Sequence, residues 1–300
     1  MAEEKRERLW TREIAAFLER CRGRGSAVRS VDFYRRWIGA FAAWCGGQGV
    51  GELSDVTPSL VAAWRDHCLR DLHHSAATVR VRQEVVTAFL RFCTEEGYTR
   101  EFPSSIRVAK PKRERPVPRW LSDRDADRML RVAQESGARD AALVSLLLLA
   151  GLRVSEAVGM RIGDVQLRQE AASWVTIHAG KGMKTRRVPL PRRGRDALAR
   201  WIRESRPRGD GFLFPGRDGK GHLTSKAAAL LVERLRIRAG VAESVSPHQL
   251  RHTFAHRLVS RGVPLERVAE LLGHSSLNTT RIYVAPTPKE LASDVARAWE

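Results

Sequence analysis

Apolar residues recur at helical spacing through the first third of the chain. Apolar positions three and four residues apart predict helices over residues 3–21 and 27–45. Capping residues mark the starts of two more helices, the third at Thr57 and the fourth at Ser75 or Thr78. The second helix carries an aromatic stripe that we expect in a hydrophobic core: Phe33, Trp37, Phe41 and Trp44.

The remaining two thirds of the chain combine this helical pattern with a short strand pattern. Alternating and β-branched residues at 174–178 and 186–190 flank a glycine-rich turn and predict a β-hairpin with Lys181 at its tip. Helices are expected near residues 123–135, 138–150, 195–204, 225–239, 247–261 and 264–272. The predicted fold class is therefore mainly α with a small β-hairpin or sheet.

Charge divides the chain into two expected domains and a linker. Residues 1–106 carry 16 basic and 14 acidic side chains, and residues 107–300 carry 37 and 20, within an overall net charge of +19. Residues 107–119 contain six basic residues and three prolines, a composition that stays extended. We expect a helical domain over 1–106, this linker over 107–119, and a mixed domain over 120–300.

The positive charge predicts a polyanionic partner and salt-sensitive binding. We favour a linker that follows the phosphates of such a partner through Lys110, Lys112, Arg113 and Arg115 over an ordinary solvated linker. A merely arginine-rich surface is the alternative reading of the overall charge. Only 8 of the 53 basic residues are lysines, so a lysine at the hairpin tip is harder to explain by composition alone than an arginine would be. Lys184 lies nearby in the sequence and competes with Lys181 for the same role.

The cysteines and the N-terminus predict a cytoplasmic protein without metal or membrane attachment. The four cysteines lie in the first hundred residues without C-x-x-C or zinc spacing, and we expect small core or helix-face residues in a reducing compartment. The N-terminus is charged and lacks the apolar core of a signal peptide. The longest apolar stretch, residues 141–152, is shorter than the roughly 20 residues that span a bilayer.

The helix expected at 247–261 opens with an anion-binding arrangement. Ser246 as N-cap, Pro247 at the first position and Gln249 at the third form a capping box. His248 then lies among unpaired backbone N–H groups at the positive end of the helix dipole, and Arg251 shares its face. A capped surface helix with an incidental histidine and arginine is the equally weighted alternative for this motif alone.

Five stretches, in this order and spacing, resemble the tyrosine recombinase (phage integrase) family, most closely the bacterial Xer-type recombinases. They are GLRVSE, GKG before TRRVPL, HQLRHTFA, LLGHSS and the downstream Tyr283. The resemblance covers about residues 27–287. It implies a helical, SAM-like core-binding domain followed by a mixed α/β catalytic domain, together forming a C-shaped clamp around DNA.

The resemblance also implies a set of catalytic residues. Tyr283 is expected to be the nucleophile, forming a 3′-phosphotyrosyl ester that keeps the bond energy for rejoining. The expected roles of the others are phosphate clamping by Arg153 and Arg251, proton transfer or phosphate binding by His248, phosphate binding by His274, and protonation of the leaving oxygen by Lys181. Glu156 is expected to orient a neighbouring histidine or arginine. With this many cations around one phosphate, we expect no metal, no ATP and no other cofactor.

The expected partner is a double-stranded DNA recombination site, bound by a dimer that forms a tetramer on synapsis, with itself or with a paralogous recombinase. Polar helix faces in the first domain are candidates for DNA contact, although a solvated face is at least as probable for each arginine: Arg29, Arg35, Arg36, Arg80 and Arg82. The tail at 288–300 carries apolar residues at helical spacing and is expected to dock on a neighbouring subunit or on its own domain. Chromosome-dimer resolution and mobile-element integration or excision both remain open as the biological role.

Two other functions are compatible with these residues. A type IB topoisomerase uses the same nucleophile chemistry to relax DNA without exchanging partners. A non-catalytic DNA-binding module is the second alternative, and it is disfavoured because every catalytic position carries competent chemistry.

Overall fold

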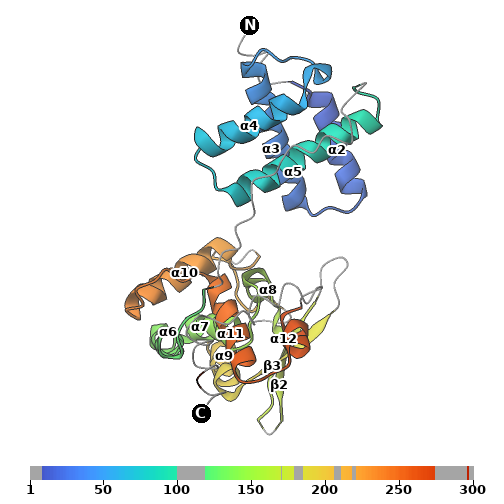
Figure 1. Ribbon diagram of the computed structural model, residues 1–300. Helices are drawn as coiled ribbons and strands as arrows, with labels where there is room; N and C mark the ends of the chain where they lie inside the picture. The colour runs from blue at the N-terminus through green and yellow to red at the C-terminus, as the bar shows by residue number, and fades with distance from the viewer. Residues whose placement is uncertain are drawn as a thin grey trace. The chain divides into compact units, whose positions relative to one another are not determined.

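The computed structural model describes residues 9–99, 119–169, 171–178, 185–205, 211–217, 221–273 and 296. The chain forms two compact units, residues 1–116 and 117–300, and each is described by itself. Both are mainly helical, and the second also contains a small antiparallel sheet (Figure 1). The fold class predicted from the sequence is therefore confirmed. No helix among the described residues is both long enough and apolar enough to traverse a bilayer.

The first unit packs its helices around an aromatic core. Its elements are α2 (Thr11–Gly23), α3 (Val28–Gly47), the 3-10 helix η1 (Leu53–Asp55), α4 (Pro58–Arg70) and α5 (Ala76–Glu95). Phe41, Trp64 and Phe89 are almost completely buried at its centre, and the rings of Phe41 and Trp64 meet edge to face at 5.3 Å. Ring pairs of this geometry add to the free energy gained by burying the apolar surface itself.

The predicted helix starts in this unit are confirmed where capping side chains define them. The Thr57 side chain accepts the backbone N–H of Leu60, and Ser75, rather than Thr78, caps α5. In the described residues the first helix begins at Thr11, because Trp10 has a left-handed backbone with φ 57°. Phe33 is 37% exposed, so the prediction that the whole aromatic stripe of α3 is core is wrong for this residue.

The second unit is built around the apolar helix α7 (Ala138–Leu148), whose described neighbours cover it on several sides. Its other helices are α6 (Asp123–Ser136), α8 (Val154–Val158), α9 (Arg192–Ser205), α10 (Ser225–Arg238), α11 (Pro247–Ser260) and α12 (Leu265–Leu272), with the 3-10 helix η2 (Ile162–Asp164). Helices α6, α8, α9, α10 and α11 all contact α7, so most of this unit shares one core.

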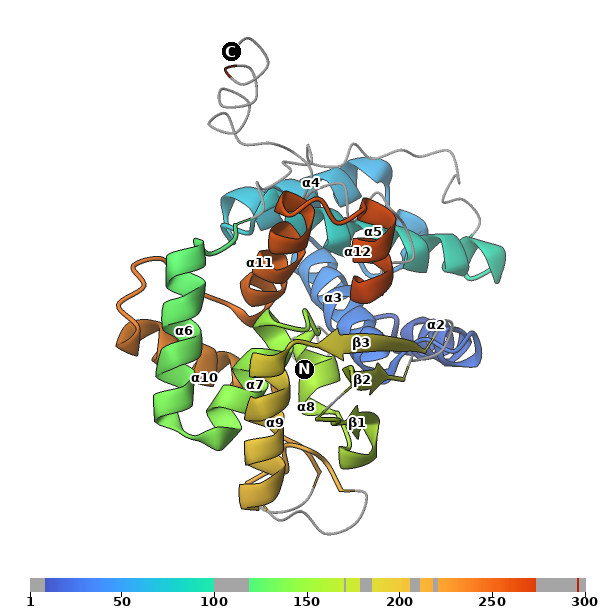
Figure 2. The same ribbon diagram turned by 90° about the horizontal axis from the view of Figure 1, so that it is seen from below.

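The sheet consists of β1 (Val165–Gln166), β2 (Ser173–Ile177) and β3 (Arg186–Leu190) in sequence order, all antiparallel. The hairpin of β2 and β3 confirms the sequence prediction, and its register pairs Val175 with Val188. The short strand β1 was not predicted, since two residues carry no period. Figure 2 shows the strands beside one another, and β3 contacts both α9 and α12.

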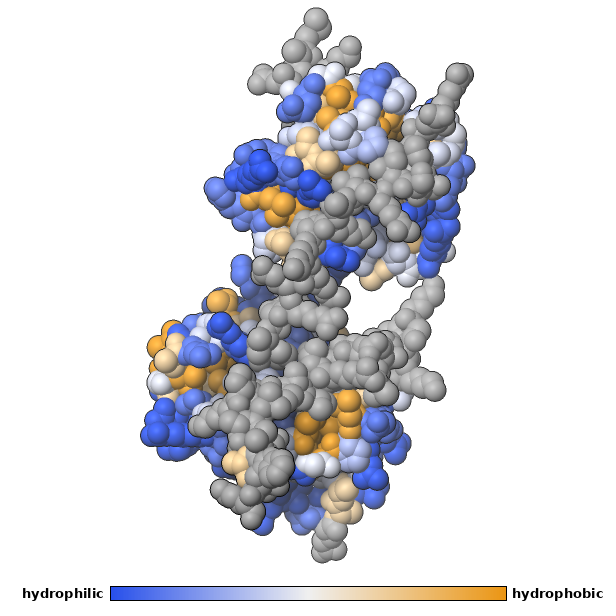
Figure 3. Space-filling view, in the orientation of Figure 1, coloured by the Kyte–Doolittle hydropathy of each residue, from blue (hydrophilic) through white to orange (hydrophobic). Residues whose placement is uncertain are grey.

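Most of the drawn surface is hydrophilic, with apolar patches between (Figure 3). One apolar patch lies on α10, where Leu230 and Ile237, seven residues apart, are each 63% exposed. The cysteines behave as predicted for small core residues, since Cys45, Cys68 and Cys93 are buried and free. Burial raises the pKa of Cys45 and of Cys93 to about 12, so both thiols stay protonated at neutral pH.

Candidate active site

Arg153 stands at the N-terminus of α8, directly after a glycine turn that ends the apolar helix α7. Gly151 has φ +63°, and a Cβ there would meet the Phe254 ring at 2.2 Å, so this turn requires glycine on two counts. The turn directs Arg153 toward Glu156, three residues on, which accepts its backbone N–H at 2.8 Å and its Nη1–H at 2.9 Å. The Arg153 side chain is 35% exposed, so it is reachable from solvent.

Glu156 is the acidic centre of the described site. Its side chain is 13% exposed, and it accepts hydrogen bonds from Arg153 and from both terminal nitrogens of Arg186, at 3.1 and 2.8 Å. Burial alone would raise the pKa of this carboxyl, but the hydrogen bonds and charge of Arg186 and the bonds from Arg153 outweigh burial and hold its pKa below the ordinary value. The carboxylate therefore stays charged and holds arginines, not a histidine, among the described residues.

Arg251 lies on α11, one turn after His248, but its side chain is buried. It is 1% exposed, donates to the Gly151 carbonyl at 2.8 Å and to the Leu272 carbonyl at 2.6 Å, and lies 3.8 Å from Glu156. Arg251 does share a helix face with His248 by spacing, but its guanidinium is buried while His248 is exposed. The packing of α12 against α11 turns this guanidinium inward, where two carbonyls and a carboxylate compensate its charge.

His248 opens α11 as the capping pattern predicts. Ser246 is the N-cap and accepts from Gln249, Gln249 accepts in return from the Ser246 N–H at 2.8 Å, and Pro247 occupies the first turn. His248 is exposed as a residue, yet partial burial of its ring, followed by the charges of Arg251 and Arg153, lowers its pKa. His248 lies one turn before Arg251 on α11, and the charges of both arginines contribute to this shift in its pKa.

His252 lies behind His248 on the same face of α11. The two rings meet edge to face with centroids 4.2 Å apart. Burial of the ring, with the charges of His248 and Arg251, lowers the pKa of His252 to about 4. At neutral pH His252 is therefore a neutral support for the His248 ring.

Arg186 belongs to this cluster, and the sequence analysis did not single it out. It begins β3, its side chain is 11% exposed, and besides holding Glu156 it donates from Nε to the Leu271 carbonyl at 2.9 Å. The sequence does carry a signal for Arg186, because residues 186, 188 and 190 share one face of a strand. The structure buries Val188 and Leu190 on this face, so Arg186 lies on the core side of the strand.

Several predicted residues lie outside the described part of the chain. They are Lys181, Lys184, His274, Tyr283, and the linker residues Lys110, Lys112, Arg113 and Arg115. Of the residues that the structure describes, it therefore brings together Arg153, Glu156, His248 and Arg251, and adds Arg186. No cluster of histidine, cysteine, aspartate or glutamate suited to a metal ion occurs within the described ranges.

The arginines predicted to contact DNA from the first unit differ in exposure. Arg29, Arg35 and Arg36 are exposed on α3, and Arg80 is half-buried, 3.5 Å from Glu84. Arg82 is only 6% exposed, so the expectation that it lies on a polar face is wrong. Its guanidinium lies over the Trp37 ring at 3.3 Å and contacts His74, because residue 82 falls on the buried stripe of α5 between Val79 and Val86.

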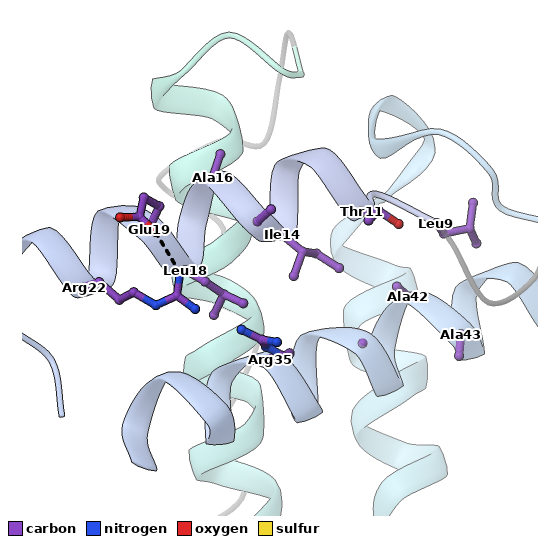
Figure 4. Close-up of a pocket in the computed structure, with 12 residues that line it drawn as sticks. Leu9, Thr11, Ile14, Ala16, Leu18, Glu19, Arg22, Arg35, Ala42 and Ala43 are labelled. Carbon is purple, nitrogen blue, oxygen red and sulfur yellow. Dashed lines mark hydrogen bonds and ion pairs between the residues drawn. The ribbon is translucent and has the colours of Figure 1, made fainter. Parts of the chain in front are cut away.

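A groove of about 620 Å³ lies between α2 and α3, far in sequence from the arginine cluster. Apolar residues such as Ile14 and Ala42 line most of it, and Arg22 and Arg35 lie toward one end, where Arg22 bonds Glu19 at 2.7 Å (Figure 4). Because the lining of the groove is mostly apolar, we take the arginine cluster as the functional site.

Comparison with known proteins places the chain in a family. The family model of the phage integrase family matches residues 119–290. Tyrosine recombinase XerD of Brucella suis is 35% identical over 283 residues, covering 87% of each chain, and tyrosine recombinase XerC of Azotobacter vinelandii is 34% identical over 281 residues, covering 90% of each. The chain is a tyrosine site-specific recombinase and belongs to the phage integrase family.

Solved structures agree in fold. The XerH site-specific recombinase bound to its difH substrate in a pre-cleavage complex is 24% identical, with a TM-score of 0.74 over 94% of this chain and 84% of that one. A post-cleavage complex of XerH with palindromic difH is 22% identical, with a TM-score of 0.77 over 92% of this chain and 82% of that one. The described fold is thus similar to that of XerH in these two complexes.

Proposed function

We propose that this chain cuts and rejoins DNA at a specific site through a 3′-phosphotyrosyl intermediate, as a recombinase of the Xer type. The observation that carries the proposal is the convergence of Arg153 and Arg251 on the largely buried Glu156, with His248 one turn before Arg251 on α11. Arginine forks match the geometry of phosphate oxygens and spread its charge, and the N-terminus of α11 favours an anion. The net charge of +19 supports a DNA partner.

Each described residue has a role in this proposal. Arg153 binds a non-bridging phosphate oxygen, since its described bonds use one hydrogen on each terminal nitrogen and a guanidinium carries five N–H groups. Because Arg251 is buried, it stabilises the phosphate through its positive charge from within the protein. His248 accepts the proton of the attacking phenol, and its lowered pKa keeps it neutral and able to do so near pH 7.

The remaining roles fall to residues beyond the described ranges. The Tyr283 oxygen attacks phosphorus, the bond from phosphorus to the 5′ oxygen breaks, and Lys181 gives that oxygen a proton, with Lys184 as the alternative donor. His274 donates a hydrogen bond to the second non-bridging oxygen. Rejoining is the reverse, with a 5′ hydroxyl of the partner strand attacking the phosphotyrosyl ester. The cationic side chains compensate the phosphate charge, so the proposal requires no metal ion.

We further propose that both units contact the duplex. Arg29, Arg35 and Arg36 on the exposed side of α3, with Arg80, would bind phosphates from the first unit, and the basic residues of 107–119 would follow the backbone. Two chains would occupy one site and four would form the synapse, with the same chain or a paralogous recombinase as partner. The tail at 288–300 would dock within or between subunits.

The proposal is tested by covalent trapping. A pool of nicked duplexes with a randomised core is incubated with the protein, and DNA that stays attached to protein after denaturation is amplified and sequenced. We expect one family of sites, attachment through the 3′ phosphate, and complete loss of trapping in Tyr283→Phe but not in the matched control Tyr34→Phe. Trapping that persists in Tyr283→Phe, or none in the wild type, would contradict the proposal.

A second arm separates strand exchange from relaxation. Two differently labelled duplexes that carry the recovered site are mixed with the protein, and hybrid products are compared with relaxation of a supercoiled plasmid lacking the site. We expect hybrids that depend on the site. Relaxation without hybrids would favour a type IB topoisomerase activity.

A further inference from the structure

We infer that Arg186 is a positioning residue of the recombinase: it acts through Glu156 and the end of α12 to set Arg153 and the backbone from which His274 departs. The inference rests on the proposed function. Arg186 makes none of the phosphate contacts proposed above.

Three arginines hold three consecutive carbonyls at the C-terminus of α12. Arg186 donates to Leu271 at 2.9 Å, Arg251 to Leu272 at 2.6 Å, and Arg153 to Gly273 at 3.3 Å. The last carbonyls of a helix have no partner within the helix and carry its negative dipole end, so cations stabilise them. These side chains come from β3, α11 and the start of α8, so three separate elements fix one helix end.

Arg186 joins this helix end to the carboxylate. Its Nη1 and Nη2 donate to the two oxygens of Glu156 at 3.1 and 2.8 Å, while its Nε points to Leu271. Glu156 in turn receives Arg153 at 2.9 Å, so a displacement of Arg186 is passed to Arg153 through a shared carboxylate. With 11% of its side chain exposed, Arg186 is a support and not a DNA contact.

Gly273 fits closely against this guanidinium. It has φ +64°, and a Cβ there would meet Arg186 at 2.7 Å from Nη1 and 3.0 Å from Cζ. The left-handed glycine therefore serves both to end α12 and to admit the flat arginine beside it. His274 directly follows Gly273 in the chain, so the position of Gly273 fixes the point from which the chain continues to His274.

A lysine cannot replace this arrangement. An ammonium carries charge but not the planar fork that reaches two carboxylate oxygens and a carbonyl together. We therefore expect both Arg186→Gln and Arg186→Lys to misplace the cluster, with the charge retained in the second. Arg187, the next residue on the strand, is exposed and gives a matched control, Arg187→Gln, with the same change of charge.

The experiment measures single-turnover cleavage of the nicked site, separately from DNA affinity and thermal unfolding. For Arg186→Gln and Arg186→Lys we expect cleavage to fall about 100-fold, the effect of a misplacement near 1 Å, with the dissociation constant within about threefold of wild type. Arg187→Gln should cleave within about threefold of wild type. Full cleavage by Arg186→Lys would overturn the inference, as would losses matched by equal losses of DNA binding.

A modified substrate separates this role from an effect on Lys181, which falls between β2 and β3 in the sequence. A sulfur in place of the 5′ bridging oxygen leaves without a proton, because thiols are far more acidic than alcohols. A defect that passes through Lys181 would disappear on this substrate, and that result would overturn the inference. We expect the 100-fold defect to persist. Failure of wild-type protein to trap DNA would instead count against the proposed function alone.

If Arg186→Gln melts below the assay temperature, Arg186→Lys carries the test. If both unfold, Glu156→Gln with Arg186 intact should show the same split between cleavage and binding, and unchanged cleavage there would overturn the inference.

Discussion

Within the described parts of the two units, each unit has one arginine that is more than nine-tenths buried, and the two are compensated in different ways. Arg82 in the first unit is 6% exposed, lies over the Trp37 ring and contacts His74, and its Nε has no hydrogen-bond partner among the described residues. Burial lowers its pKa, while Cys68 opposes the change. Arg251 in the second unit is 1% exposed and has a carboxylate and two carbonyls around it. Arg82 is therefore packed like a core side chain, although it carries a charge. The charge of Arg251, by contrast, is fixed in position by two hydrogen bonds and a nearby carboxylate.

The comparison predicts that only the second arginine matters for chemistry. For Arg251→Gln we expect a fall in cleavage of about 1000-fold, because a preorganised positive charge beside the phosphate is worth roughly 3–4 kcal/mol in the transition state. The free energy of unfolding should also fall by about 2–4 kcal/mol, since two buried carbonyls lose their donor. Single-turnover cleavage and urea unfolding measure the two effects. Arg257→Gln is the control: Arg257 lies on the same helix as Arg251, its substitution breaks an ion pair with Asp123 of α6, and the variant should cleave within about threefold of wild type.

Glu156→Gln tests whether the carboxylate organises the cluster. We expect cleavage to fall about 100-fold and stability to fall at neutral pH. The pKa of Glu156 is lowered in the folded protein, so its stabilisation is present above the ordinary carboxyl value of about 4.3 and is lost as the pH falls through the lowered value. The stability difference between wild type and variant should therefore be constant from pH 7 to about 5 and shrink below that. A difference that grows on acidification would contradict this view.

His252 adds a third case to the comparison, a buried ring that is neutral in the folded protein at pH 7. Its pKa is lowered to about 4, so the folded protein resists protonation that the unfolded chain accepts near pH 6.5. The stability contributed by neutral His252 is full above about pH 6.5 and is lost as the pH falls toward 4. We expect His252→Gln to lose less stability than wild type between pH 7 and pH 5, measured as urea midpoints. Equal losses in both proteins would sink this prediction.

The smallest effect is expected at Arg82. An apolar side chain of similar length can replace a buried charge with little cost, so Arg82→Met should change the free energy of unfolding by less than about 1 kcal/mol. Cleavage should stay within about twofold of wild type. A large loss of DNA binding in this variant would show that Arg82 reaches the duplex after all, and would break the contrast with Arg251.

The sequence predicted best where local chemistry decides the structure. Ser75, Thr57 and Ser246 accept from the backbone N–H groups that capping requires, and alternation over 186–190 gave the correct hairpin. The same alternation places Arg186 beside two buried residues, so attention to strand faces would have found it. Likewise Arg82 shares a helical stripe with Val79 and Val86, which a check of i, i+3 and i+7 would have revealed.

Tertiary packing decided what local pattern could not. Arg251 and His248 share a helix face by spacing, yet only the docking of α12 shows that one is buried and the other exposed. The three carbonyls at 271–273 likewise have no signature of their own, because any helix ends in free carbonyls. The resemblance to recombinases named the catalytic positions, but nothing in that pattern indicated that they share one buried carboxylate.

The end of α12 also marks a natural place to divide the polypeptide. Its terminal carbonyls are satisfied by side chains of β3, α8 and α11, so within the described body the helix needs no downstream partner to close it. A fragment finishing at Gly273 would keep these bonds, and the nucleophile could then be supplied on a second, separately made peptide. Such a split enzyme would turn strand cutting into an event controlled by mixing two pieces.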